Sequence, residues 1–115
     1  MAGEEFSTIE VAIVESDDQC RQFISAVIGG TPQFRVACAC STGREALWSF
    51  AQKPPGLVLV SLFLRDMTGT NFIQRARALW PAVSPILLIP DNYPRLLIEA
   101  LEAGASAYLP KPCGA

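Results

Sequence analysis

The chain has 115 residues, of which 50% are hydrophobic and 17% are charged, with 9 basic and 11 acidic side chains and no histidine. This length suits a single domain with one core. The absence of histidine excludes Ser-His-Asp and Cys-His catalysis and histidine-based metal sites, and a net charge of −2 argues against a nucleic-acid or anionic-membrane surface.

The first half of the chain alternates strand and helix patterns. Residues 9–14 are β-branched and apolar, which favours a strand, and a polar turn follows at 15–18. Apolar residues then recur at helical spacing up to residue 28, with Asp17 or Asp18 as the N-cap and two glycines at the end. Residues 34–39 favour a second strand. A capping box at Thr42 opens a helix to about Gln52.

The second half continues the alternation. Residues 57–62 are continuously apolar, which indicates a strand buried on both faces. A third helix spans about 72–80 before Pro81, and a fourth strand spans 85–89. Asn92 is the expected cap of a fourth helix that ends near Ala103, with Gly104 at its C′ position. Residues 106–109 favour a fifth strand.

This β-α-β-α-β-α-β-α-β order predicts an α/β fold with a doubly wound parallel sheet. Ligands of such sheets bind beyond the carboxyl ends of the strands. The residues that follow the expected strands are Glu15, Ser16, Ser61, Pro90, Asp91 and Lys111.

The N-terminus lacks a signal peptide and no apolar run could cross a bilayer, so we expect a cytoplasmic domain with no membrane contact. In that compartment Cys20, Cys38, Cys40 and Cys113 are expected to be reduced thiols. Cys38 and Cys40 share a strand face, where a soft-metal site is one interpretation and a small buried hydrophobe is the favoured one.

Three stretches resemble the receiver domain of bacterial response regulators: residues 13–16, residues 55–61 with Gly69, and residues 100–112 ending in Lys-Pro. The opening of the second helix at residues 43–47 also fits. The resemblance covers nearly the whole chain and implies the flavodoxin-like strand order 2-1-3-4-5, a fifth strand at the sheet edge, a switch aromatic at Tyr108 and a cis Lys111–Pro112 bond.

The strand ends depart from that family's phosphorylation pocket. Where the family has a phosphoacceptor aspartate, an acid pair and a Ser or Thr, this chain has Ser61, Glu15-Ser16 and Pro90, and Lys111 alone keeps its type. A neutral serine is a poor acceptor and one carboxylate is a weak Mg²⁺ anchor. We therefore expect a degenerate pocket with no metal, no cofactor and weak or absent Mg²⁺ binding. Ser61 would be satisfied by backbone, and Lys111 is expected to pair with Glu15.

Tyr108 is expected to hold one position, inward or outward, because Pro90 offers no hydroxyl. The fourth helix carries Leu96, Leu97, Ile98 and Leu101, an apolar excess that suggests an interface with a protein partner or a second copy. The chain stops where the family's fifth helix would begin. Either the chain continues beyond residue 115, or another chain covers the sheet face beside the first helix. We favour the first, with residues 1–115 as the N-terminal part of a longer regulator whose remainder holds that helix and a C-terminal output domain, often DNA-binding in this family.

The sequence thus favours an atypical, non-enzymatic receiver that regulates transcription through protein contacts without aspartyl phosphorylation, and that does not itself bind nucleic acid. A phosphorylatable receiver with an altered pocket is the main alternative. A nucleotide- or flavin-binding enzyme of similar topology is a minor one, since the acidic loop at residues 15–18 would repel phosphates and no glycine-rich phosphate motif occurs.

Overall fold

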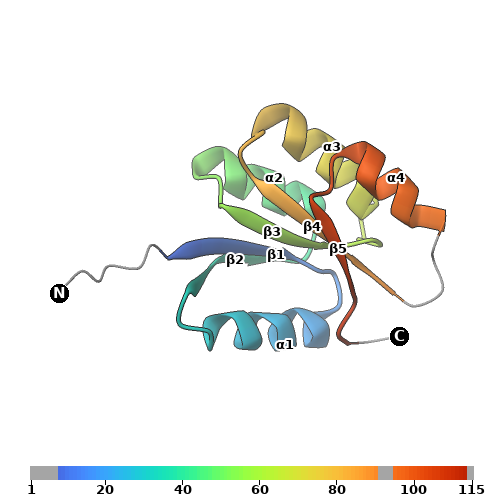
Figure 1. The fold of residues 1–115 in the computed structure, drawn as a ribbon. Helices are drawn as coiled ribbons and strands as arrows, with labels where there is room; N and C mark the ends of the chain where they lie inside the picture. Colours follow the sequence, from blue (N-terminus) through green and yellow to red (C-terminus); the bar gives the residue numbers. More distant parts are fainter. Residues whose placement is uncertain (1–7, 91–94, 114–115) are drawn as a thin grey trace.

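A five-stranded parallel sheet forms the centre of the molecule, with the strands in the order β2-β1-β3-β4-β5 (Figure 1). The computed structural model describes residues 8–90 and 95–113, and side chains over 8–90 and 98–113. The predicted doubly wound fold and strand order are confirmed. The strands are β1 (Ile9–Val14), β2 (Phe34–Cys40), β3 (Leu57–Ser61), β4 (Ser84–Ile89) and β5 (Ala107–Pro110).

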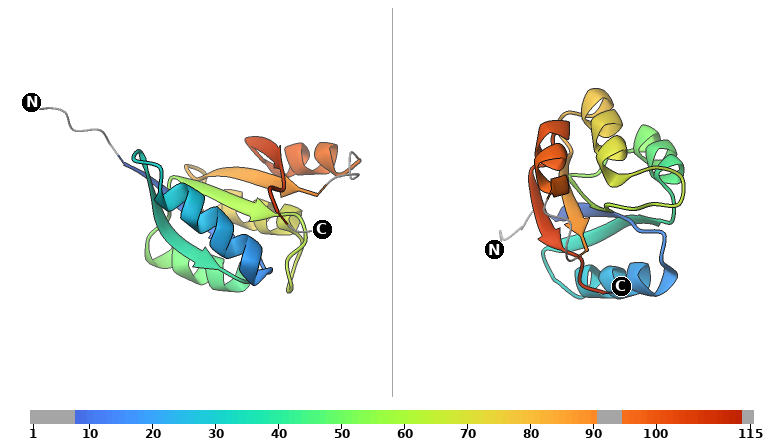
Figure 2. Two further views of the ribbon diagram at one scale, coloured as in Figure 1. Left: turned by 90° about the horizontal axis from the view of Figure 1, so that it is seen from below. Right: turned by 90° about the vertical axis from the view of Figure 1, so that its right-hand side faces the viewer.

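Four helices connect the strands and cover the sheet unequally. α1 (Asp18–Gly29) packs on one face, and α2 (Gly43–Gln52), α3 (Gly69–Leu79) and α4 (Arg95–Ala103) pack on the other (Figures 1 and 2). The strand boundaries differ from the sequence-based ones by no more than one residue at any end. The third helix begins three residues earlier than its apolar pattern suggested, because Thr68 caps it.

Side-chain caps begin three of the helices. Asp17 accepts a hydrogen bond from the Cys20 backbone N–H, and Thr42 accepts one from the N–H of Glu45, as the sequence predicted. Gly104 has φ of +111°, the left-handed conformation expected after a helix end. The predicted cap at Asn92 lies outside the described residues. Each of these three N-caps sets the residue at which its helix begins.

A β-bulge in β2 decides which face its side chains cover. Val11 pairs with Val36 and Ala12 pairs with Cys38, so Ala37 is an extra residue in the strand. Before the bulge, β2 packs against the α1 core. After it, Cys38 and Cys40 pack into the core under α2 to α4. The bulge therefore turns both thiols toward α2.

The face covered by α1 keeps exposed apolar surface. Phe23 and Val27 are each about half exposed. They border a groove of about 340 Å³ whose other lining residues include Ile28, Leu88, Leu109 and Pro112. Within the described residues, the sheet face under α1 therefore keeps an open apolar groove.

Two expectations about the C-terminal segment are wrong. No cis peptide bond occurs in the described residues, so the Lys111–Pro112 bond is trans, which is the intrinsically favoured isomer. Cys20 and Cys113 are not reduced thiols but form a disulfide. The sheet brings the segment after β5 next to the first turn of α1, which sets the two Cα atoms 5.5 Å apart, within the range that a disulfide spans.

Candidate functional site

Four residues singled out from the sequence follow strand ends at the carboxyl edge of the sheet. Glu15 follows β1, Ser61 closes β3, Pro90 follows β4 and Lys111 follows β5. Glu15 and Ser61 are both only 1% exposed. They are the polar residues of the described chain that are fully buried, which is costly unless their polar atoms find partners.

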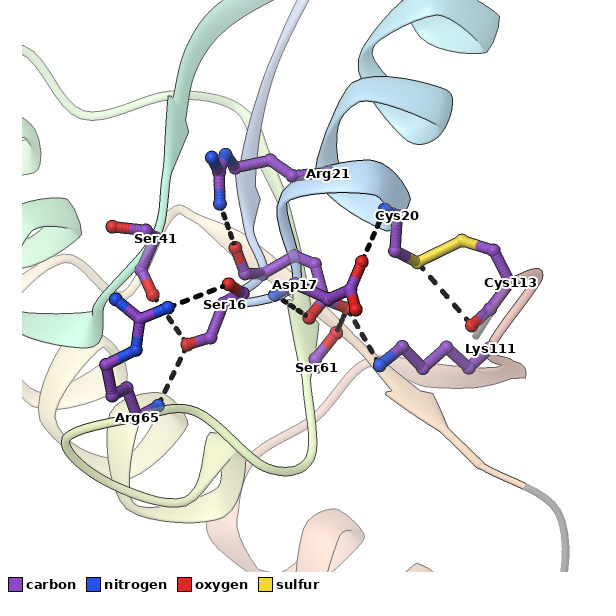
Figure 3. A network of polar contacts seen from close by, with 10 residues as sticks. Ser16, Asp17, Cys20, Arg21, Ser41, Ser61, Arg65, Lys111 and Cys113 are labelled. Atoms are coloured by element: carbon purple, nitrogen blue, oxygen red, sulfur yellow. Dashed lines mark hydrogen bonds and ion pairs between the residues drawn. A yellow bond between two sulfur atoms is a disulfide. The ribbon is translucent and has the colours of Figure 1, made fainter. Parts of the chain in front are cut away.

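The Glu15 carboxylate is the centre of this edge. Three residues that contact it, Asp17, Ser61 and Lys111, lie close together in Figure 3. Lys111 Nζ lies 3.1 Å from Glu15 Oε1, and the Ser61 hydroxyl donates a hydrogen bond to the same oxygen. The backbone N–H of Asp17 donates to Oε2 at 2.9 Å. The carboxylate thus has a cation, a hydroxyl and an amide as partners, the condition under which a buried charge is stable. We name Glu15, Ser61 and Lys111 the carboxylate cluster.

The expected pairing of Lys111 with Glu15 is confirmed. The expectation that backbone groups satisfy Ser61 is wrong, because its hydroxyl turns to the Glu15 side chain. The reason is geometric. β1 and β3 are adjacent strands, so the residue after β1 and the last residue of β3 lie side by side.

Ser16 takes no part in the carboxylate cluster and instead ties two loops together. Its hydroxyl donates to the Ser41 carbonyl at 2.6 Å and accepts from the Arg65 N–H at 2.8 Å. The Arg65 guanidinium also donates to the Ser16 carbonyl at 3.2 Å. The loop after β3 is therefore fastened to the loop after β1 through a residue, Arg65, that the sequence analysis missed.

Asp66 fastens the same loop to α2. Its two carboxylate oxygens accept hydrogen bonds from the N–H groups of Gly43 and Arg44, both at 2.9 Å. Partial burial acts to raise the pKa of Asp66, but these hydrogen bonds, together with the backbone N–H of Asp66 itself and the charge of Arg44, lower the pKa below its ordinary value. Acidic side chains favour helix N-termini, so the contact between Asp66 and the start of α2 follows a general preference. The sequence did not reveal it because α2 begins more than twenty residues before Asp66.

The remaining site residues lie near the outer strands. Pro90 is half-buried, and β4 continues its pairing through the Lys111 N–H, which donates to the Ile89 carbonyl at 2.9 Å. Tyr108 is 47% exposed on the edge strand β5, the outward of the two positions considered. It does not contribute to the carboxylate cluster.

The apolar residues predicted as an interface are described only in part. Ile98 is 64% exposed and Leu101 is 52% exposed on α4. The side chains of Leu96 and Leu97 lie outside the described part of the chain. Tyr108 and Leu109 of neighbouring β5 are also about half exposed. The exposed apolar side chains on α4 and β5 make up what we call the α4–β5 surface.

The chemistry of the site is that of a closed polar cluster. Within residues 8–90 and 95–113, no group of three or more His, Cys, Asp or Glu side chains converges in a way that could hold a metal ion. Asp17 uses its carboxylate to cap α1, accepting from the Cys20 N–H at 2.8 Å.

In the same described part, no helix has the length and apolar character needed to cross a membrane.

Comparisons with known proteins agree with this fold. The chain is 32% identical over 108 residues to a protein-glutamate methylesterase/protein-glutamine glutaminase of Treponema pallidum, covering 92% of this chain and 27% of that protein. It is 36% identical over 104 residues to the KDP operon transcriptional regulatory protein KdpE of Escherichia coli, covering 90% of this chain and 45% of that protein. The chain thus spans less than half the length of these relatives.

Solved structures show the same architecture. The signal receiver domain of the putative response regulator NarL from Mycobacterium tuberculosis superposes with a TM-score of 0.86 at 18% identity, over 94% of this chain and 87% of that one. The family model for the response regulator receiver domain matches residues 11–115. The chain therefore belongs to the response regulator receiver domain family, whose members serve two-component signalling.

Proposed function

We propose that this receiver domain works without aspartyl phosphorylation and transmits its signal through protein contacts. One observation carries the proposal: the buried Glu15 carboxylate already holds the Lys111 ammonium at 3.1 Å and the Ser61 hydroxyl. In a phosphorylatable receiver, the lysine at this position pairs with the modified aspartate. Here Lys111 already pairs with Glu15. The pocket is thus balanced in charge with no phosphoryl group.

The chemistry of Ser61 supports the same conclusion. A serine hydroxyl is neutral near pH 7 and needs a base to act as a nucleophile. Glu15 is the nearest carboxylate, but it is neutralised by Lys111 and also accepts from the Asp17 N–H. Ser16 is held by Ser41 and Arg65 and offers a hydroxyl where Mg²⁺ prefers carboxylate oxygen. We therefore propose weak or absent Mg²⁺ binding and no enzymatic activity.

The α4–β5 surface is the proposed contact region. Ile98 and Leu101 are more than half exposed, and exposed apolar patches mark partner sites. This surface would form a homodimer or would contact an output domain. In either case the domain would be part of a longer cytoplasmic transcription regulator. In that arrangement a DNA-binding domain outside this chain would contact the DNA, since the chain itself carries a net charge of −2.

The alternative is a phosphorylatable receiver with an altered pocket, and one experiment separates the two. Amide NMR spectra would be recorded with Mg²⁺ and beryllium fluoride, and intact mass would be measured after incubation with acetyl phosphate. We expect no saturable shift near residues 15, 61 and 111 and no phosphoryl adduct. A saturable shift at millimolar Mg²⁺, or an adduct at Ser61, would refute the proposal.

A matched variant shows that the assay can detect a functional pocket. The double substitution Ser16→Asp and Ser61→Asp supplies two carboxylates at the carboxyl edge and gives Lys111 a second anionic partner. With Mg²⁺ and beryllium fluoride, this variant should show shifts that the unmodified protein lacks. Equal responses from both proteins would contradict the assignment of Ser16 and Ser61 as the residues that disable the pocket.

A further inference from the structure

Two free thiols lie on the C-terminal half of β2, outside the carboxylate cluster. Cys38 and Cys40 stand two residues apart after the bulge, so their side chains share the face that packs against α2. Cys38 is half-buried and Cys40 is buried, at 5% exposure. Neither takes part in the Cys20–Cys113 disulfide, and neither is used by the proposed receiver function.

Cys38 opens into a small polar pocket. The pocket has a volume of about 220 Å³, and its lining includes Glu10 of β1, Arg35 of β2, and Ser49 and Lys53 at the C-terminal end of α2. Arg35 and Lys53 lie 3.8 Å and 3.6 Å from the single Glu10 carboxylate. Two exposed cations thus face one carboxylate, which leaves a net positive charge at the pocket mouth.

The surroundings of Cys38 favour its thiolate. The hydrogen bond from Cys40 lowers the pKa of Cys38 to about 6, overcoming burial, which raises it. A second hydrogen bond from Ser49 also lowers this pKa, and the charge of Glu45 on α2 raises it. The same contact, with burial, raises the pKa of Cys40, so this thiol keeps its proton. These surroundings favour the anion at Cys38 and the protonated thiol at Cys40.

We propose that Cys38 is a site of reversible thiol–disulfide exchange with small anionic disulfides, which enter the pocket between β2 and the end of α2. The Cys38 thiolate attacks one sulfur of the small disulfide and a new S–S bond forms. The S–S bond of the reagent breaks, and its second sulfur leaves as a thiolate with the bonding electron pair. The Cys38 sulfur is formally oxidised by one unit and the departing sulfur of the reagent is reduced by one unit, so the number of disulfide bonds stays the same.

Cys40 acts as a positioning residue and not as a resolving thiol. Extended backbone separates the Cα atoms of residues i and i+2 by roughly 6.5 Å, at the upper limit for a disulfide, which usually spans up to about 6.8 Å. Its raised pKa and its burial also keep it from attacking. The mixed disulfide at Cys38 therefore persists until an external thiol removes it.

The test uses the complete chain without reductant, so that the Cys20–Cys113 disulfide stays closed. Reaction with the anionic aromatic disulfide DTNB is followed by absorbance, and the modified peptide is identified by mass spectrometry. We expect one fast equivalent at Cys38, with a pH–rate midpoint near 6. An ordinary thiol of pKa about 8.5 would be less than ~1% ionised at that pH. The pH profile is the readout because low thiol pKa also reduces intrinsic nucleophilicity.

Variants assign the roles. Cys38→Ser should abolish the fast phase. Cys40→Ala and, independently, Ser49→Ala should keep it but move its midpoint upward, with circular dichroism confirming that each variant is folded. Fast labelling of Cys40, Cys20 or Cys113, or a midpoint of about 8 or above in the unmodified chain, would overturn the proposal. So would an unchanged midpoint in both donor variants.

The charge preference has its own control. The double variant Arg35→Gln and Lys53→Gln should slow the reaction with DTNB by a few-fold at low salt, since exposed charges act weakly across a screened surface. Its reaction with the neutral reagent 4,4′-dithiodipyridine should change little. Equal slowing with both reagents would show that the pocket does not select anions and would overturn that part of the proposal.

Discussion

Removing the lysine of the carboxylate cluster is the sharpest test of how this pocket is held together. Lys111→Met keeps most of the aliphatic stem but leaves Glu15 without its cation. The Glu15 side chain is 2% exposed and the Lys111 side chain is 14% exposed, so water cannot replace the ammonium fully. Breaking a buried pair in this way costs about 3–5 kcal/mol. Because Ser61 and the Asp17 N–H still donate to the carboxylate, we expect the lower end, about 3 kcal/mol.

Urea unfolding followed by circular dichroism measures this loss. With a slope of about 1.5 kcal/mol per M, a loss of about 3 kcal/mol lowers the midpoint by about 2 M. Lys53→Met is the matched control, since Lys53 is 76% exposed and lies 3.6 Å from Glu10 in a surface pair. Such pairs contribute about 0–1 kcal/mol, so its midpoint should move by less than about 0.7 M.

A double variant separates the charge from the shape of the cluster. Glu15→Gln combined with Lys111→Met removes both charges and retains an oxygen that accepts from Ser61. The double variant should recover most of the stability lost by Lys111→Met alone, because no uncompensated charge stays buried. If Lys111→Met behaves like Lys53→Met, or if the double variant is no better than Lys111→Met, the ion pair is not what balances the buried carboxylate.

Two further predictions concern other contacts. The disulfide joins residues 93 apart, so Cys113→Ser should lower the free energy of unfolding by about 4–5 kcal/mol in the chain-entropy estimate; an unchanged urea midpoint relative to the oxidised protein would show that Cys20 and Cys113 are not joined in solution. Asp66 has a lowered pKa in the folded state, so its contribution is present above its unfolded value of 3.8 and is lost as pH falls through the lower folded pKa. As the pH falls from about 5 to about 2, the free energy of unfolding of Asp66→Asn should therefore decrease less than that of the unmodified protein. Identical pH profiles of the urea midpoint would refute this.

The local pattern of the chain was sufficient to predict the elements and their order. Strand and helix periods, the Asp17 and Thr42 caps and Gly104 are properties of neighbouring residues, and each is confirmed. Parallel pairing then follows because alternating strands and helices can bury their apolar faces in few ways. The carboxyl ends of parallel strands share one edge of the sheet. The sequence alone therefore predicted that Glu15, Ser61 and Lys111 lie close together.

Contacts between distant segments were decided only by the tertiary structure. Cys20 and Cys113 read as separate thiols until the sheet placed the end of β5 beside α1. Arg65 and Asp66 looked like ordinary loop residues, yet they fasten the loop after β3 to two other segments.

The bulge at Ala37 is a similar case, because an extra residue in a strand reverses which side chains face the core. Sequence patterns report the period of a segment and the residues at its ends. Which partners meet across the fold depends on register and packing, which arise only when all five strands are assembled.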